Sequence, residues 1–376
     1  MNRRSFLGTG TGAAAAIAAP GITTLPFLRS AGHYLPGLAP DKPIRLSSNE
    51  NPLGMSDWAK RAILEGMTET NRYPRQDDAL YTAIANKHAV KPENVVLGAG
   101  STDVLRMAVQ SLASPGARVV LPDPTFEHVE AYARPFIPDI VKVPLAPDHA
   151  LDLDAMLAAA KAAKGPALLF ICNPNNPTGT ITPCDDVEAA IKAAPETFTF
   201  LVDEAYFDFV EDPVYRTLIP LISRANVIVS RTFSKVYGLA GLRAGYGLAS
   251  PATVDRTKRV MLKNTINHFA GVAVLSSIND AAFMKRSVET NRRGRAVAQK
   301  TLADLEIEAL PSHTNFVMHR IRGNLNDYIA RMRDEGIQVG RAFPPMLEYN
   351  RVSIGTPEQM DVWADTLRKF RSKGWA

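Results

Sequence analysis

The chain has 376 residues, of which 46% are hydrophobic and 22% charged, a composition that supports a large apolar core and more than one domain. The formal net charge of +5 is spread thinly and no basic stripe or nucleic-acid motif accompanies it, which argues against a nucleic-acid partner. Two cysteines imply no disulfide framework, and the histidines lack the spacing of metal ligands.

The first residues carry a pattern typical of export. Arg3 and Arg4 precede an uncharged, mildly apolar run over residues 8–19, which resembles a twin-arginine signal. The run is too short and too rich in Gly, Ala and Thr to predict a membrane span. We therefore expect a signal peptide over residues 1–30 and a periplasmic protein. A disordered tail on a cytoplasmic protein is the alternative.

Further along, the sequence predicts a strand that ends at residue 97, a Gly-Ala-Gly-Ser-Thr turn, and a helix from residue 103 to residue 112. Backbone donors at such a helix start, with the helix dipole behind them, bind phosphate well. Gly100, Ser101 and Thr102 are therefore candidates for a phosphate cradle. A short glycine-rich turn is weak support when taken alone.

Two predicted strands are followed by candidate ligand contacts. Phe126 comes after the strand at residues 118–121 and could stack on a flat heterocycle, although it could equally belong to the core. Asn176 lies in an Asn-Pro-rich turn after the apolar run 167–171. Such a turn is usually only a connection, but its place at a strand end favours a ligand contact.

A third apolar run, residues 198–202, ends abruptly in acids, as a buried parallel strand does at its carboxyl end. Asp203 follows it directly, and Tyr206 comes three residues later. Ligands of open α/β sheets bind at this edge. An acidic helix N-cap is the alternative interpretation of Asp203.

Residues 230–243 read Ser-Arg-Thr-Phe-Ser-Lys-Val-Tyr-Gly-Leu-Ala-Gly-Leu-Arg and predict a cofactor anchor. Desolvation and neighbouring cations would lower the pKa of Lys235, and its neutral amine could then form a Schiff base with an aldehyde. Arg243, Thr232 and Ser234 offer donors to a phosphate. The pattern suggests pyridoxal phosphate, with Asp203 on its ring nitrogen. A solvated surface lysine is the alternative.

Strands and helices alternate from about residue 56 to residue 263, which predicts a mostly parallel sheet with helices on both faces. A long helical region, strands near 315–319 and 351–354, and a closing helix at 357–371 follow. We expect a large cofactor-binding domain over residues 56–263 and a smaller α+β domain over residues 264–376, joined by an N-terminal arm at 31–55.

The motifs occur in a recognisable order: Ser-Asn-Glu-Asn-Pro-Leu-Gly, Arg-Tyr-Pro, Gly-Ala-Gly-Ser, Asn-Pro-Asn-Asn-Pro-Thr-Gly, Asp-Glu-Ala-Tyr, Ser-Lys-x-x-Gly-Leu-Ala-Gly-Leu-Arg and Arg-Val-Ser-Ile-Gly. This order, from about Leu46 to about Gly355, resembles the fold-type I pyridoxal-phosphate-dependent aminotransferases, specifically the histidinol-phosphate aminotransferase group. The resemblance implies a homodimer that moves amino groups between an amino donor and a 2-oxo acid.

The resemblance also implies roles for single residues. Lys235 would hold the cofactor and shuttle a proton, Asp203 would pair with the ring nitrogen, and Tyr206 and Asn176 would contact the ring hydroxyl. Phe126 would stack on the ring. The phosphate would be surrounded by Gly100, Ser101, Thr102, Thr232, Ser234 and Arg243, with Tyr73 reaching it from the neighbouring subunit.

For the substrate, the resemblance implies that Arg351 clamps the α-carboxylate, with Asn51 near the same group. Arg341 corresponds to an arginine that helps to bind the distal phosphate of histidinol phosphate. Its connecting segment, residues 342–348, is short and proline-rich, so aromatic or acidic amino acids stay open as substrates, and Arg341 could be a surface cation.

Three other functions stay open at this point. A decarboxylase of the same family would release carbon dioxide. A pyridoxal-phosphate-dependent regulator would carry a DNA-binding module, but only about 45 residues precede the first motif. A cofactor-binding protein without catalysis would not need the lysine, the aspartate and both clamping arginines.

Overall fold

The computed structural model describes residues 43–75, 77–224 and 226–375. The predicted leader, residues 1–30, and the first part of the predicted arm, residues 31–42, lie outside the described residues. Within those residues, none of the helices combines the length and the apolar character that crossing a bilayer requires.

The largest sheet has seven strands in the order β2-β8-β7-β6-β5-β3-β4. Their bounds are β2 Val95–Gly98, β3 Arg118–Asp123, β4 Asp139–Pro144, β5 Ala167–Cys172, β6 Phe198–Asp203, β7 Val227–Thr232 and β8 Gly245–Ala249. The five strands from β7 to β4 pair in parallel, whereas β8 is antiparallel to both of its neighbours. The predicted mostly parallel α/β sheet is confirmed.

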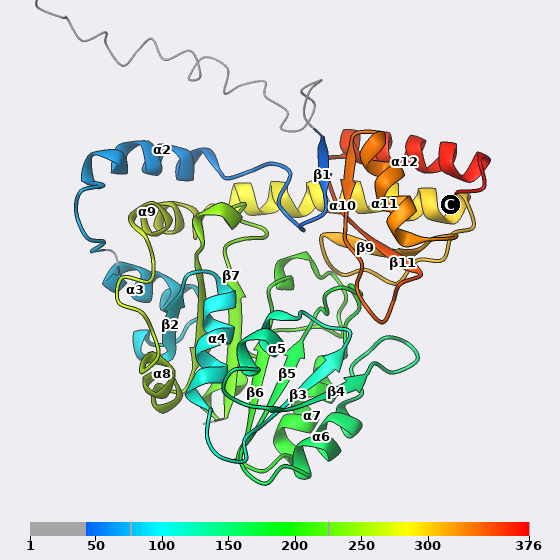
Figure 1. Cartoon of the computed structure of the whole chain (residues 1–376). Helices are drawn as coiled ribbons and strands as arrows, with labels where there is room; N and C mark the ends of the chain where they lie inside the picture. The colour runs from blue at the N-terminus through cyan, green and yellow to red at the C-terminus, as the bar shows by residue number, and fades with distance from the viewer. Residues whose placement is uncertain (1–42, 76, 225, 376) are drawn as a thin grey trace, which may run out of the picture. The chain divides into compact units, whose positions relative to one another are not determined.

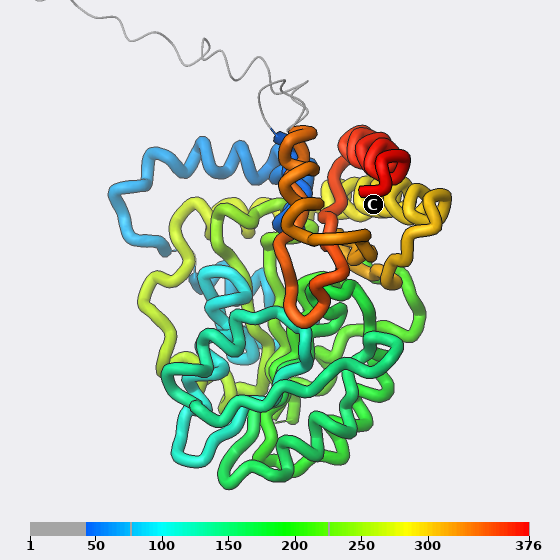
Figure 2. Tube along the Cα trace, turned by 45° about the vertical axis from the view of Figure 1, so that its right-hand side comes forward, coloured from blue at the N-terminus to red at the C-terminus, as the bar shows by residue number. Residues whose placement is uncertain are grey.

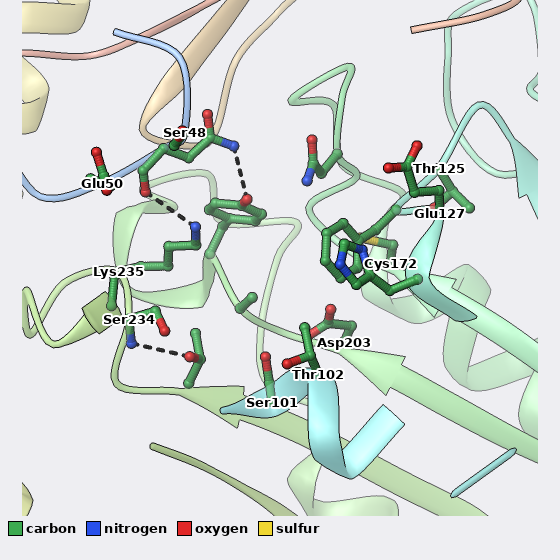
Figure 3. Close-up of a pocket in the computed structure, with 18 of the residues that line it drawn as sticks. Ser48, Glu50, Ser101, Thr102, Thr125, Glu127, Cys172, Asp203, Ser234 and Lys235 are labelled. Atoms are coloured by element: carbon green, nitrogen blue, oxygen red, sulfur yellow. Dashed lines mark hydrogen bonds between the residues drawn. The ribbon is translucent and has the colours of Figure 1, made fainter. Parts of the chain in front are cut away.

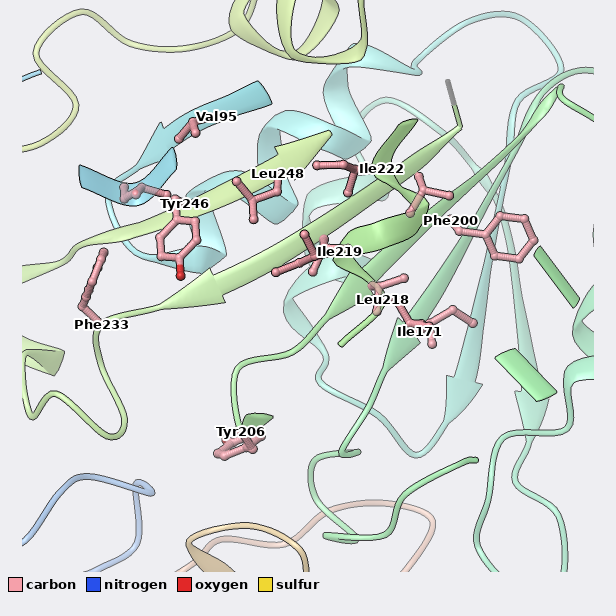
Figure 4. Close-up of a cluster of buried hydrophobic side chains, with 14 of the residues drawn as sticks. Val95, Ile171, Phe200, Tyr206, Leu218, Ile219, Ile222, Phe233, Tyr246 and Leu248 are labelled. Carbon is pink, nitrogen blue, oxygen red and sulfur yellow. The ribbon is translucent and has the colours of Figure 1, made fainter. Parts of the chain in front are cut away.

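Alternation along β5 shows how the sheet is covered on both faces. Ala167, Leu169 and Ile171 belong to one apolar cluster, and the intervening Leu168 and Phe170 belong to another on the opposite face. Because successive side chains of a strand point to opposite faces, a strand buried on both sides must be apolar throughout. Figure 4 shows part of the first cluster, with Phe200 and Leu248 among its members.

Helices from different parts of the chain form the two covering layers. The first cluster takes in α3 Asp77–Lys87, α6 Leu153–Lys161, α7 Cys184–Ala193 and α9 His268–Ser277. The second takes in α4 Ser101–Ser111, α5 His128–Ala133 and α8 Pro251–Lys258. Helix α2, Asp57–Gly66, packs along α9 (Figure 1). The short 3-10 helices are η2 Met67–Glu69, η3 Pro92–Asn94, η4 Phe207–Phe209, η5 Ile219–Ser223 and η6 Ala240–Leu242.

The C-terminal part of the chain builds a separate apolar cluster around the buried Trp363 and Tyr328. Two small sheets contribute to it, one antiparallel and one parallel. Its elements are β1 Ile44–Leu46, α10 Ala281–Asp304, β9 Phe316–Arg320, α11 Leu325–Asp334, β10 Ile337–Val339, β11 Tyr349–Ser353 and α12 Pro357–Ser372. Figures 1 and 2 both show α12 alongside α10.

Three strands were not predicted from the sequence. β4 lies at the edge of the large sheet with a mixed polar pattern, so its apolar signal is weak. β1 and β10 have three residues each and pair across nearly the whole chain, Ile44 with Ile337. Strands this short depend on their partner rather than on local propensity.

Candidate active site

A cavity of about 350 Å³ lies where β5, β6 and β7 end, and segments from the N-terminal and C-terminal parts of the chain line its other side. This volume is within the usual range of small-molecule sites. All the predicted site residues except Gly100, Asn51 and Tyr73 line the cavity. In Figure 3, Lys235 and Ser234 lie on one side of it and Glu127 and Thr125 on the other.

Lys235 is positioned by the turn that follows β7. Its Nζ donates a hydrogen bond of 3.2 Å to the backbone oxygen of Asn49. Burial, with the positive charge of Arg351 as the next cause, lowers the pKa of Lys235 to about 8. At pH 7 about one lysine in ten is then neutral, compared with about one in 3,000 at the ordinary pKa. Lys235 thus has the lowered pKa that a nucleophilic amine needs, and its bond to a cofactor stays a prediction.

Asp203 is the last residue of β6 and is 4% exposed. Ser230 on the neighbouring strand β7 donates a hydrogen bond of 2.8 Å to its Oδ1. Burial raises the pKa of Asp203 to about 6, and the hydrogen bond from Ser230 opposes that rise. A cation in the cavity, such as a protonated ring nitrogen, would stabilise the ionised carboxylate.

A buried ion pair ties together the strands that carry these two residues. Glu204 follows Asp203, and its carboxylate lies 2.6 Å from the guanidinium of Arg231 on β7. Both side chains are almost fully buried, and Glu204 also accepts a backbone hydrogen bond from Leu218. Removal of either partner would leave an unpaired buried charge, which is strongly destabilising. The sequence analysis did not single out this pair.

Several of the residues that were predicted to bind a phosphate meet at the start of α4. Arg243 donates a hydrogen bond of 3.2 Å from Nη2 to the hydroxyl of Thr102. A side chain at Gly100 would place its Cβ 2.3 Å from the same Nη2, and the backbone there has a φ of +86°. Gly100 therefore acts through its small size, which lets the guanidinium lie against the first turn of the helix. Ser101, Thr232 and Ser234 also line the cavity.

Arg351, on β11, reaches the cavity from the C-terminal part of the chain. Its two terminal nitrogens donate to Oδ1 of Asn176, at 2.6 Å, and to the backbone oxygen of Ser47, at 2.9 Å. It is 7% exposed, and its Nε has no hydrogen-bond partner in the structure. Burial lowers the pKa of Arg351 to about 10, so it stays charged at neutral pH. The incompletely satisfied fork is suited to an anionic substrate group.

Asn49 is a cavity residue that the sequence analysis missed. Its amide nitrogen donates a hydrogen bond of 3.0 Å to the hydroxyl of Tyr206, and its backbone oxygen accepts from Lys235. Ser353 donates to its Oδ1, and its φ is +55°, in the left-handed region. The Ser-Asn-Glu-Asn-Pro motif contains two asparagines. Only their contacts with residues distant in the sequence show which of the two lines the cavity.

Asn51, the asparagine that was predicted near the substrate, does not line this cavity. It donates to the backbone oxygen of Val236 and to the hydroxyl of Ser287, and so supports the turn that carries Lys235. Tyr73 is also outside the cavity and is 81% exposed. Its predicted contact belongs to a second subunit, which a single chain does not contain.

Phe126 and Arg341 both line the cavity and each has a neighbour that was not predicted. Phe126 stacks on His128, with ring centroids 4.4 Å apart. Arg341 forms an ion pair of 2.6 Å with Glu127 and lies over the ring of Phe343. Arg341 thus lines the cavity although its side chain is 53% exposed, and its contact with a distal phosphate stays a prediction.

The chemistry of the cavity fits a phosphorylated aromatic aldehyde. A cradle of hydroxyls and one guanidinium lies at a helix N-terminus, where an anion is stabilised. A buried carboxylate with a raised pKa and a partly buried amine with a lowered pKa line the same space. The described part of the chain holds no cluster of three or more histidine, cysteine or acidic side chains that could bind a metal ion.

The chain belongs to the family "Aminotransferase class I and II", whose sequence profile matches residues 41–367. The arrangement of its large sheet is that of the fold-type I transferases. Among curated relatives, histidinol-phosphate aminotransferase 1 of Cupriavidus pinatubonensis is 37% identical, and the match covers 87% of this chain and 88% of that protein. Histidinol-phosphate aminotransferase 2 of Ralstonia nicotianae is 36% identical over 91% of both chains.

A solved structure supports the same grouping. The histidinol-phosphate aminotransferase of Sinorhizobium meliloti, crystallised in complex with pyridoxal-5'-phosphate, matches with a TM-score of 0.83 and 28% identity. The match covers 95% of this chain and all of that chain.

Proposed function

We propose that this protein is a pyridoxal-phosphate-dependent aminotransferase that moves an amino group between a histidinol-phosphate-like donor and a 2-oxo acid. The observation that carries the proposal is a cavity lined by Lys235, Asp203 and the buried Arg351, together with Arg243 and the hydroxyl side chains at the start of α4. The pKa of Lys235 in this cavity is about 8. The names of the relatives, at 36 to 37% identity over most of the chain, support the donor class.

When bound, pyridoxal phosphate supplies an aldehyde that takes up the amino group and a ring that withdraws electrons from the substrate α-carbon. The cradle residues Ser101, Thr102, Thr232, Ser234 and Arg243 would hold its phosphate. Asp203 would pair with the ring nitrogen, and Tyr206 and Asn176 would contact the ring hydroxyl. Phe126 would cover one face of the ring.

In this proposal Lys235 has two tasks. Its Nζ holds the cofactor until an amino donor arrives, and the released amine then takes the proton from the substrate α-carbon. A pKa near 8 suits both tasks, because an effective proton carrier has a pKa close to the working pH. The hydrogen bond to Asn49 would keep the amine on the cavity side of the turn.

Arg351 would orient the substrate by binding its α-carboxylate. The guanidinium is held by Asn176 and Ser47, so its open edge is fixed before the substrate enters. Fixed donors lower the entropic cost of positioning the substrate. Arg341, nearer the surface, would meet the distal part of the molecule.

The proposal predicts that mixing the holoprotein with histidinol phosphate or glutamate converts the cofactor absorbance to that of its aminated form. Arg351→Lys, which keeps the charge and loses the two-pronged donor, should reduce kcat/KM for carboxylate donors by about 10- to 100-fold, the effect of lost charged hydrogen bonds. The cofactor dissociation constant should not change. Arg320→Lys is the matched control, because Arg320 is an exposed arginine outside the cavity.

Two results would contradict the function. Release of carbon dioxide with each turnover would favour a decarboxylase of the same family. An absorbance that no amino donor changes would favour a protein that binds the cofactor without catalysis.

We also propose a homodimer with shared active sites, in which Tyr73 reaches the phosphate of the neighbouring subunit. Helix α2 and the residues after it expose Trp58, Leu64, Met67 and Tyr73, and exposed apolar residues grouped in this way are typical of an interface. Light scattering that returned the 40.9 kDa mass of a single chain would contradict this proposal.

The domain division and the leader remain proposals. The separate C-terminal cluster supports a small domain, and the sheet cluster includes Ala270 and Ile278, so we place the boundary near residue 280 rather than 263. The twin-arginine leader and a periplasmic location depend on residues 1–30 alone. Fractionation that left the native protein uncleaved in the cytoplasm would contradict them.

A further inference from the structure

Glu127 forms an ion pair across the mouth of the cavity that no step of the proposed reaction uses. Its Oε2 lies 2.6 Å from Nη2 of Arg341. Glu127 immediately precedes α5, whereas Arg341 follows β10 in the C-terminal part of the chain. Both residues line the central cavity and also a second cavity beside it.

The other charged groups of the central cavity have partners or assigned tasks. Lys235, Arg243, Asp203 and Arg351 serve the cofactor and the substrate anion in the proposed function, and Glu50 pairs with Arg45 at 2.9 Å. Among the positively charged residues that line the cavity, Arg341 is therefore available to bind the distal part of a substrate. In this structure the carboxylate of Glu127 already binds the guanidinium of Arg341.

We propose that Glu127 determines substrate specificity by competing with the distal anionic group of a substrate for Arg341. The inference deepens the proposed function and rests on it, since it concerns the side-chain end of the same site. A donor with a distal carboxylate or phosphate must displace Glu127 before it can bind the guanidinium. A donor with an uncharged side chain leaves the ion pair intact.

The surroundings of Arg341 favour exchange of its partner over withdrawal from the cavity. Its guanidinium lies 4.3 Å from the ring centroid of Phe343, and that of Arg351 lies 4.5 Å from the same centroid. Arg341 also donates to the backbone oxygen of Ala342 at 2.8 Å. These contacts hold its charge near that of Arg351, and Glu127 offsets the repulsion between the two guanidiniums.

The size of the effect follows from exposure. The side chains of Arg341 and Glu127 are 53% and 57% exposed, so solvent screens the pair. Exposed ion pairs are worth up to about 1 kcal/mol, which corresponds to a change in affinity of up to about fivefold. Glu127 should thus bias the choice of substrate without forbidding a second anionic group.

The test compares glutarate with pentanoate, which have the same chain length and differ by one terminal carboxylate. Calorimetry on the pyridoxal-phosphate-loaded protein gives their dissociation constants without need of turnover. Glu127→Gln should lower the dissociation constant of glutarate by about two- to fivefold and leave that of pentanoate unchanged. In an Arg341→Gln background, the same substitution should change neither ligand. The kcat/KM for glutamate relative to norvaline should rise by the same factor, mainly through KM.

Glu130→Gln is the matched control, because it removes an equal charge from α5. Glu130 binds Lys142 and Arg134 and does not line the central cavity. The inference is overturned if Glu127→Gln alters both ligands equally, if it alters neither, if Glu130→Gln reproduces its effect, or if neither ligand binds. Failure of the proposed function appears separately, as an absorbance that no amino donor changes.

Discussion

Lys235→Ala should reduce kcat for transamination by about 10⁴-fold, because one side chain supplies both the attachment of the cofactor and the proton carrier. The fold should persist, since the lysine makes one hydrogen bond and its burial is unfavourable to its charge. Single-turnover absorbance and circular dichroism measure the two effects. Borohydride reduction followed by mass spectrometry should find the cofactor on Lys235 in the wild type.

Two variants separate this role from a general loss of positive charge. Lys235→Arg keeps a cation in the cavity and should be as inactive as the alanine variant. Lys192→Ala removes a surface lysine that pairs with Glu188 and should retain full activity. Transamination by Lys235→Ala at even a tenth of the wild-type rate would refute the assigned role.

The lowered pKa of Lys235 also predicts how stability depends on pH. The folded-state pKa of about 8 lies below the unfolded value of 10.5, so the unfolded chain binds more protons between these two pH values. The cost of holding the charged amine in the desolvated site is full below pH 8 and disappears as the pH rises toward 10.5. Cofactor-free Lys235→Met should therefore be more stable than wild type at pH 7, by on the order of 3 kcal/mol.

Denaturant unfolding of both cofactor-free proteins between pH 7 and pH 10.5 measures that difference. It should shrink steadily above pH 8. A difference that does not vary with pH would mean that the lysine is solvated in the folded state.

Asp203→Asn should have the second largest effect, a fall in kcat of about 10²- to 10³-fold, the usual loss when one charge-stabilising group is removed. The amide keeps the size of the side chain and the hydrogen bond to Ser230. It removes the negative charge that would keep the ring nitrogen protonated. The measurement is the rate of the first half-reaction together with the absorbance spectrum of the bound cofactor.

The control for Asp203→Asn is Asp208→Asn. Burial raises the pKa of Asp208 also, but it lies beside Arg231 and Lys87 and does not line the cavity. If the Asp203→Asn variant retained a kcat within about threefold of wild type, that result would contradict the assignment of Asp203 to the ring nitrogen. An equal fall in both variants would point to a general electrostatic or folding effect.

Much of the site could be predicted because its residues follow the strands of the large sheet in sequence. Asp203 ends β6, and Asn176 and Lys235 come soon after β5 and β7. The carboxyl ends of these parallel strands meet at one edge. A continuous apolar run that ends in polar residues is a local signal. It needs no knowledge of distant contacts to be interpreted.

The sequence by itself therefore determined the mostly parallel sheet and predicted that Lys235 and Asp203 lie together at its carboxyl edge. Only the tertiary structure decided that Asn49 rather than Asn51 enters the cavity, since its partner Ser353 is 304 residues away. The pairing of Glu127 with Arg341 was decided in the same way. The physical reason is that local patterns specify strands and turns, whereas hydrogen-bond partners and pKa shifts depend on burial between segments that meet only after folding.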